Sequence, residues 1–138
     1  MEVAVINYRG LSDAVVTSPK LFCAYSWQDI IEPMKYIYGK YAQGKDRKVF
    51  AIGFSMGANI LANVLGHLGA NSDAHNLRID GACVVQAPIR MQIACRALFE
   101  SMGGFYNRRL GHNIKILMLK HSEALNPACL QKFNKTVP

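Results

Sequence analysis

A serine between two glycines is the feature of this sequence best suited to do chemistry. Gly53-Phe54-Ser55-Met56-Gly57 matches the pattern G-x-S-x-G, in which the serine stands on a sharp turn between a strand and a helix. Glycine at both outer positions leaves room for that turn because it has no Cβ. The backbone N–H of Met56 would then point to where the oxyanion of acyl transfer forms. The pattern predicts Ser55 as a nucleophile, Met56 as an oxyanion donor, and Gly53 and Gly57 as the glycines of the elbow.

The match is specific enough to outweigh a simpler interpretation. A chain with this glycine and serine content contains about 0.04 copies of the pattern by chance. The simpler interpretation is an ordinary turn in which Ser55 only caps the next helix. An apolar run precedes the motif and an amphipathic run follows it, which is the context that the catalytic interpretation requires.

The segments around the motif alternate between strand and helix patterns. Short apolar runs predict buried strands at residues 3–7, 49–52 and 81–86. Residues 60–68 carry apolar side chains at helical spacing, and Gly69 is placed to end that helix. The order predicts an α/β fold, with parallel strands and helices on the faces of the sheet.

Another helix is predicted between the first two strands. Ser26, with Asp29 three residues later, resembles a capping box, so Ser26 is the expected N-cap. Apolar residues then recur at helical spacing to about Tyr41. Pro33 lies within this pattern and predicts a later start or a bend.

The sequence after Pro88 changes to a helical pattern. Residues 91–102 and 106–121 are predicted helices, and Gly103-Gly104 separates them. Leu110 and Ile114 belong to an apolar face of the second helix, which could line an acyl-binding cleft but which we interpret as core.

The other face of that helix is basic. We interpret it as a solvated surface with solvated histidines, although it could also contact anionic lipid headgroups. Its residues are Arg108, Arg109, His112, Lys115 and His121.

Composition limits the possible partners. The chain has 138 residues, 51% hydrophobic and 18% charged, with a formal net charge of +7, which suits one domain or part of one. The basic residues are scattered, so no nucleic-acid partner is expected.

The four cysteines and four histidines lack the spacing of a zinc site, so we expect reduced thiols and no metal or other cofactor. No run has the length of a membrane span, and the sequence does not start like a signal peptide.

Several segments resemble the YheT-like branch of the α/β-hydrolases, which includes the embryogenesis-associated proteins and the α/β-hydrolase-domain lipases and esterases. The similar segments are residues 5–10, 17–24, 53–59, 105–110 and 119–121. The resemblance implies a partial α/β-hydrolase fold in a single, incomplete domain over residues 1–138. Residues 1–88 would form its core strands and helices, and residues 89–125 a lid-like helical segment.

The resemblance also implies a function. It indicates a serine hydrolase that cleaves carboxylic esters, either lipids such as acylglycerols and phospholipids or medium-chain esters. Ser55 would form the acyl-enzyme, and residues 7–10 would only shape the site. An acyltransferase of the same fold, in which an alcohol replaces water, stays open, as do contact with a membrane surface and the oligomeric state. The expected location is cytoplasmic or membrane-associated rather than secreted.

The acid and the histidine of a catalytic triad have no good candidates in the sequence. In this fold both follow the serine, and the resemblance places them after the lid segment. Asp73 and Asp80 precede the third predicted strand, and His67 and His75 lie toward the far end of the helix after Ser55. We therefore expect an internal fragment of a longer hydrolase, or a degenerate copy. Without the triad, the chain alone should be nearly inactive, and a catalytically inactive binding module is the alternative.

Overall fold

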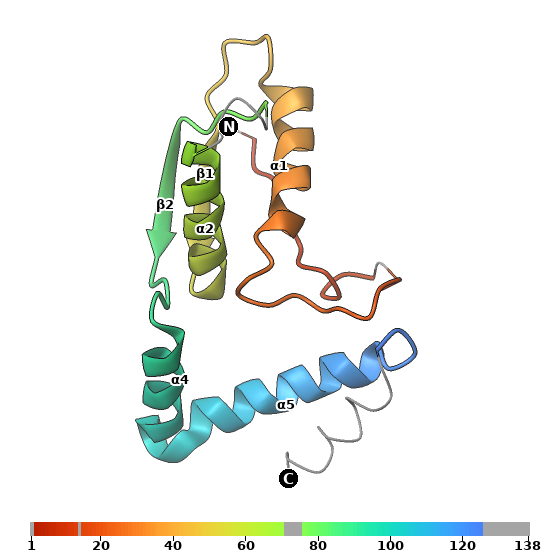
Figure 1. Ribbon diagram of the computed structural model, residues 1–138, viewed down its shortest axis with the longest axis vertical. Coiled ribbons are helices and arrows are strands. Elements are labelled where there is room, and N and C mark those ends of the chain that lie inside the picture. The colour runs from red at the N-terminus through yellow and green to blue at the C-terminus, as the bar shows by residue number, and fades with distance from the viewer. Residues whose placement is uncertain (1, 14, 71–75, 126–138) are drawn as a thin grey trace. The chain divides into compact units, whose positions relative to one another are not determined.

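The computed structural model describes residues 2–13, 15–70 and 76–125. The chain divides into two compact units (Figure 1). The first consists of Met1–Tyr8 and Phe22–Ile89, and the second of Arg9–Leu21 and Arg90–Pro138. Among the described residues, both strands belong to the first unit. The predicted division into core and lid roles stays a prediction.

The first unit is built on two parallel strands. Strand β1 (Phe50–Phe54) pairs with β2 (Gly81–Val85) in a register that runs from Phe50 opposite Gly81 to Phe54 opposite Val85. Helix α1 (Gln28–Tyr41) precedes β1, and helix α2 (Met56–Ala70) joins the two strands. The observed order confirms the predicted α/β alternation and the parallel pairing. The sequence predicts that Gly69 ends this helix, but α2 includes Gly69 and ends at Ala70.

The core of this unit lies between α1, α2 and the sheet. The apolar positions that recur at helical spacing face one another there, as the sequence predicts. Ile60 and Val64 of α2 are 1% and 0% exposed, and they are the largest fully buried side chains among the described residues. Their burial fixes which face of α2 lies on the sheet. The core residues are Ile30, Ile31, Met34, Ile60, Leu61, Val64, Leu68 and Leu77.

The two faces of the sheet differ. Successive residues of a strand point to opposite faces, and Gly53 is buried on the side where α2 packs. Phe50, Ile52 and Phe54 alternate with it and are 68%, 65% and 66% exposed. The prediction of strands buried on both faces is therefore wrong for the described part of the chain, because no described element covers the second face. The central residues of β2, at positions 82–84, are exposed as well. In the described part of the chain β2 pairs only with β1, so its other edge is also open.

Residues 3–7 do not form the predicted strand. Val3 and Val5 are 76% and 82% exposed. An extended segment becomes a strand only when a neighbour accepts and donates its backbone hydrogen bonds, and β1 pairs only with β2 in the described part of the chain. An apolar run indicates strand propensity but not the presence of that neighbour.

The start of α1 also differs from the prediction. Trp27, not Ser26, is the N-cap residue, and no side chain caps the helix. The Ser26 hydroxyl accepts the backbone N–H of Cys23 instead, at 2.9 Å. Ser26 thus closes the preceding turn, a role that competes with capping for short hydroxyl side chains. The helix runs through Pro33 rather than starting after it.

The second unit contains two helices separated by a left-handed turn. Helix α4 (Met91–Glu100) leads through η1 (Ser101–Gly104) to α5 (Phe105–Lys120), as predicted. Met102, Gly103 and Gly104 have φ values of 47°, 61° and 77°. Neither α4 nor α5 contains a buried side chain. None of the described helices has the length and apolar character needed to cross a membrane.

The expected core role of the apolar face of α5 is therefore wrong for the described structure. Leu110 and Ile114 are 48% and 45% exposed. Among the described helices and strands, α5 packs mainly against η1 and α4, and none of its residues is buried.

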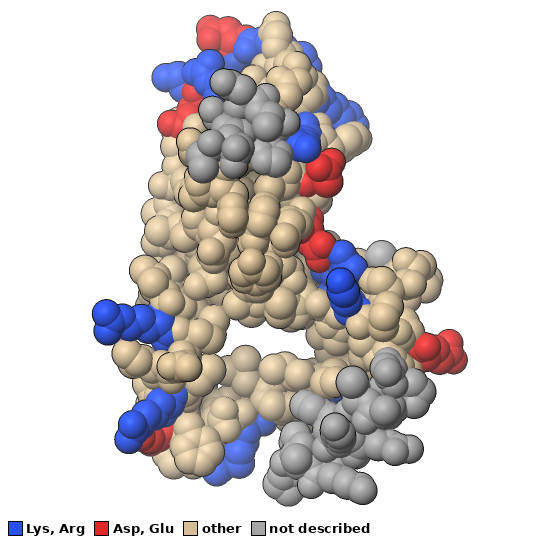
Figure 2. Space-filling model, in the orientation of Figure 1, with Lys and Arg blue, Asp and Glu red and all other residues tan. Residues whose placement is uncertain are grey.

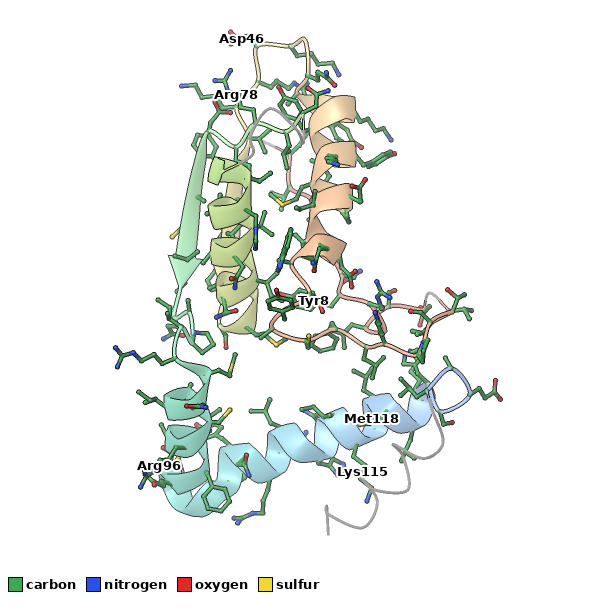
Figure 3. The ribbon with its side chains drawn as sticks, viewed as in Figure 1. Tyr8, Asp46, Arg78, Arg96, Lys115 and Met118 are labelled. Carbon is green, nitrogen blue, oxygen red and sulfur yellow. The ribbon has the colours of Figure 1, made fainter. Side chains whose placement is uncertain are left out.

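The charged residues of the first unit are unevenly placed. On the face shown in Figure 2, blue and red side chains gather at the end with the loop between α1 and β1. Residues 43–48 are exposed there. Asp46 and Arg78, labelled at this end in Figure 3, lie next to the starts of the two strands. Charge is therefore concentrated at the amino ends of the strands, opposite the end at which Ser55 lies.

Candidate active site

Ser55 forms a one-residue turn between β1 and α2. The strand ends at Phe54, and the helix begins at Met56. Ser55 has a φ of 50°, in the left-handed region that residues with a Cβ rarely adopt, and it is exposed. A non-glycine residue in this region costs about 1–2 kcal/mol, so the surroundings must hold it there. This is the backbone geometry that the G-x-S-x-G pattern predicts.

Backbone hydrogen bonds hold Ser55 on both sides. Its N–H donates to the carbonyl of Val85 at 2.9 Å, which extends the pairing of β1 with β2 by one residue. Its carbonyl accepts the N–H groups of Ala58 at 3.0 Å and Asn59 at 3.1 Å, the first turn of α2. Ser55 is thus bonded to the neighbouring strand and to the helix at once, while its side chain stays exposed.

The two flanking glycines are required by close contacts. A Cβ at position 53 would lie 2.6 Å from the carbonyl oxygen of Gly57 and 2.9 Å from the Cα of Ala58. A Cβ on residue 57 would lie 2.6 Å from the Tyr8 hydroxyl oxygen. Gly53 therefore lets the first turn of α2 return over the strand, and Gly57 leaves space for Tyr8.

Met56 is the first residue of α2. The N–H groups of the first helical turn have no carbonyl partner within the helix, and the aligned peptide dipoles make this end positive. Such an end stabilises a negative charge that develops beside it. The role of the Met56 N–H as an oxyanion donor stays a prediction, to which this position is suited.

Tyr8 belongs to the same end of the unit, although the resemblance implied only a shaping role for residues 7–10. Its ring stacks on Phe22 with centroids 5.2 Å apart, and Figure 3 shows it beside the end of α2 that carries Gly57. Burial raises the pKa of the Tyr8 phenol, so the hydroxyl stays protonated at neutral pH and can donate a hydrogen bond. The only sequence signal for this contact was the small residue at position 57.

The acidic residues considered for a triad do not lie beside Ser55 in the first unit. Asp80 precedes β2, and its carboxylate accepts the Val49 N–H at 2.8 Å, next to the start of β1. The hydrogen bond from Val49 is the main cause that lowers the pKa of Asp80, and Arg78 adds to it. Asp80 therefore lies at the opposite end of the strands from Ser55, as expected. Asp73 lies outside the described residues.

The histidine of α2 is also far from Ser55. His67 follows Ser55 by twelve residues, or about 18 Å along the helix. Its ring stacks on Trp27, with centroids 3.8 Å apart. His75 lies outside the described residues. Within the described part of the first unit, no histidine is positioned to take a proton from Ser55.

The histidines of the second unit differ from each other. His112 is exposed, as predicted. His121 is not solvated, and here the prediction is wrong, because the ring is 9% exposed and its Nε2 lies 2.8 Å from the carbonyl oxygen of Gly10. Helix α5 ends at Lys120, which turns the next side chain away from the basic face and toward the loop of residues 9–21.

Metal and thiol chemistry have no support in the described part of the chain. No group of three His, Cys, Asp or Glu side chains is close enough there to hold a metal ion. Cys23, Cys83 and Cys95 are free and exposed, and Cys129 lies outside the described residues. A hollow of about 580 Å³ is lined by Leu65, Leu68 and their neighbours, at the end of α2 away from Ser55. Of these features, the arrangement at Ser55 combines an exposed side-chain nucleophile with an imposed backbone conformation.

Known proteins resemble this chain in sequence. It is 28% identical to embryogenesis-associated protein EMB8 of Picea glauca over 86% of this chain and 24% of that protein. It is 29% identical to monoacylglycerol lipase ABHD2 of Mus musculus over 88% of this chain and 28% of that protein. The chain is a distant homologue of α/β-hydrolase lipases and esterases. The two parallel strands with their helices are accordingly a partial α/β-hydrolase fold.

A shorter match has a higher identity. The chain is 39% identical to medium-chain fatty acid ethyl ester synthase/esterase 2 of Saccharomyces cerevisiae over 71 residues, which are 51% of this chain and 15% of that protein. The chain spans about a quarter of the length of the relatives that it matches over most of its own length. No family model matches the chain, and no solved structure does.

Proposed function

We propose that Ser55 is the nucleophile of a serine esterase that cleaves fatty-acid esters. The observation that carries the proposal is the backbone of Ser55, which is left-handed, exposed and bonded to both Val85 and the first turn of α2. Strain of this kind persists where the surrounding structure imposes it, and such residues cluster at active sites. Homology to lipases and esterases supports the same chemistry.

The reaction proceeds through an acyl-enzyme. The Ser55 oxygen attacks the ester carbonyl while its proton passes to a general base, and the carbonyl oxygen becomes an oxyanion beside the Met56 N–H. Collapse of this intermediate breaks the bond to the alcohol, which leaves with a proton. Water then attacks the acyl-enzyme and releases the fatty acid. The base is a histidine that the described first unit does not supply, so the proposal assigns it to another part of the protein.

The substrate is an ester of a medium or long acyl chain. Relatives named as a monoacylglycerol lipase and as a medium-chain fatty acid ethyl ester synthase/esterase support this class. The second of these names also favours acyl transfer to an alcohol as a second candidate function. The two reactions share the Ser55 acyl-enzyme and differ in whether water or an alcohol reaches it.

A fluorophosphonate probe tests the role of Ser55. The full-length protein should be labelled, Ser55→Ala should lose the label, and Ser101→Ala, which removes another exposed serine hydroxyl, should keep it. An unlabelled wild-type protein beside a labelled control esterase would favour the inactive binding module. Unchanged turnover of p-nitrophenyl octanoate by Ser55→Ala would reject Ser55 as the nucleophile. Adding ethanol to the ester assay of the unlabelled wild-type protein and measuring ethyl ester formation separates transfer from hydrolysis.

A further inference from the structure

Gln86 has the same unusual backbone conformation as Ser55. It follows β2 directly and has a φ of 54°. Glycine adopts this region freely, and asparagine and aspartate do so more often than other residues, but glutamine has no local reason to prefer it. The conformation is therefore imposed by the structure around Gln86.

Gln86 lies next to Ser55 at the edge of the sheet. Phe54 pairs with Val85, so Ser55 and Gln86 occupy the next position of the two parallel strands. The Ser55 N–H donates to the carbonyl of Val85, which belongs to the peptide bond between Val85 and Gln86. Both left-handed residues thus stand side by side where the two strands end.

The chain after Gln86 is also tied to the elbow. The side-chain amide of Asn59 donates to the carbonyl of Pro88 at 3.1 Å, and the backbone N–H of Asn59 donates to the carbonyl of Ser55 at 3.1 Å. Asn63 bonds in turn to the Asn59 backbone carbonyl at 2.9 Å. Gln86 is therefore held from Val85 on one side and from Pro88 on the other, by residues that also position Ser55.

The Gln86 side chain is available to a ligand. The residue is exposed, and its carboxamide makes no hydrogen bond to other described residues. A carboxamide offers two N–H donors and a carbonyl acceptor, so it can bond a hydroxyl group in either direction. It carries no charge and has no preference for an ionised headgroup. These properties suit a neutral alcohol that carries free hydroxyl groups.

We propose that Gln86, whose backbone is held beside that of Ser55 at the ends of the two strands, uses its exposed carboxamide to bind a free hydroxyl on the alcohol part of the ester and so selects glycerol esters over simple alkyl esters. The inference rests on the proposed role of Ser55, because the ester must be bound at that oxygen. A site that hydrogen-bonds a substrate hydroxyl discriminates against analogues that lack it. One neutral hydrogen bond corresponds to about a three- to tenfold difference in kcat/KM.

The test compares two esters of the same acid in the full-length protein. The measured quantity is the ratio of kcat/KM for 1-monooctanoylglycerol to kcat/KM for ethyl octanoate. Gln86→Leu should lower this ratio about three- to tenfold, mainly through the glycerol ester. Gln86→Asn keeps a carboxamide and should retain a larger part of the ratio than Gln86→Leu. Gln92→Leu, at an exposed glutamine of α4, is the matched control and should leave the ratio unchanged.

A second variant guards against misfolding. Gln86→Gly accepts the positive φ without a Cβ and removes the same carboxamide, so it should fold and lower the ratio as Gln86→Leu does. A merely structural role would reduce both activities equally, and titration with the fluorophosphonate probe counts the competent sites. An unchanged ratio in Gln86→Leu and Gln86→Gly, with wild-type turnover intact, overturns the role of Gln86 alone. A wild-type protein that turns over neither ester overturns the role of Ser55 as well.

Discussion

The Cα of Gly53 lies so close to Gly57 that a Cβ at position 53 would be 2.6 Å from the Gly57 carbonyl oxygen. The first turn of α2 thus crosses directly over the end of β1, and Ser55 connects the two. The atoms in the way belong to the backbone, which cannot move aside without displacing the helix. Gly57 differs, because the atom nearest to its missing Cβ is the hydroxyl at the end of the Tyr8 side chain.

Gly53→Ala should therefore destabilise the protein by about 1–3 kcal/mol, the usual cost of overpacking a tight site. Gly66→Ala is the control, because position 66 lies in the same helix and nothing is within 4 Å of its missing Cβ. That change should stabilise the protein by about 0.5–1 kcal/mol through helix propensity. Denaturant unfolding measures both. Equal effects of the two substitutions would contradict the close crossing at Gly53.

Gly57→Ala should destabilise the protein, and adding Tyr8→Phe should recover part of the lost stability. The added methyl group and the Tyr8 hydroxyl compete for one space, and removing the hydroxyl frees it, since the next ring atom is 3.9 Å away. A double-mutant cycle on the free energy of unfolding should give a favourable coupling of about 0.5–3 kcal/mol. Strict additivity would show that the hydroxyl does not occupy this space.

The helices could be predicted from the sequence because their signal is local. The spacing of Ile60 and Val64 defines a face whatever lies opposite, and both residues are buried as expected. The apolar run at residues 3–7 carries no comparable information, because a strand exists only with a partner. Val5 is exposed for that reason. The burial of Phe50 and Ile52 likewise depends on elements that their own sequence does not specify.

The turn at Ser55 could be predicted for the same reason as the helices. The pattern around Ser55 encodes its own turn, since the glycines that allow the turn are within two residues of it. Tyr8 and His121 take their roles from contacts with Gly57 and Gly10, which lie 49 and 111 residues away. Glutamine rarely adopts a left-handed backbone, so the residue type at position 86 does not predict this conformation. Contacts distant in sequence and imposed strain are therefore what the sequence alone did not reveal.

Replacing Ser55 should show that the elbow stores strain. Ser55→Gly relieves the left-handed backbone and should be more stable than Ser55→Ala by about 1 kcal/mol, while neither variant can form an acyl-enzyme. Ser101 is the control, because its φ is −70° and glycine gains nothing there. At that position the alanine variant should be the more stable of the two. Thermal or denaturant unfolding of all four variants shows whether glycine or alanine is the more stable residue at each position.

Asp80 should make stability depend on pH at the amino ends of the strands. Its pKa is lowered in the folded protein, chiefly by the Val49 N–H, from about 3.9 in the unfolded chain. The folded state therefore disfavours protonation, and the contribution is fully present above about pH 4. It is lost as the pH falls through the lower, folded pKa. Asp80→Asn should lower the midpoint of thermal unfolding at pH 7, and the difference from wild type should shrink below about pH 4.

Asp46→Asn controls for net charge in that experiment, because Asp46 is exposed at the same end of the unit. A difference between Asp80→Asn and wild type that stays constant from pH 7 to pH 3 would show that the Asp80 carboxylate does not favour the folded state.

His121 should stabilise the second unit through its bond to Gly10. The ring is buried, and its Nε2 lies 2.8 Å from the Gly10 carbonyl oxygen, so that nitrogen must carry the proton that the carbonyl accepts. His121→Phe keeps an aromatic ring but leaves this buried carbonyl without its donor, which costs about 1–3 kcal/mol. His112→Phe changes an exposed histidine of α5 and should have an effect within about 0.5 kcal/mol.

Because His121 bonds to the loop of residues 9–21, amide hydrogen exchange in that loop should accelerate in His121→Phe and not in His112→Phe. Unchanged exchange in both variants would mean that the contact does not order the loop.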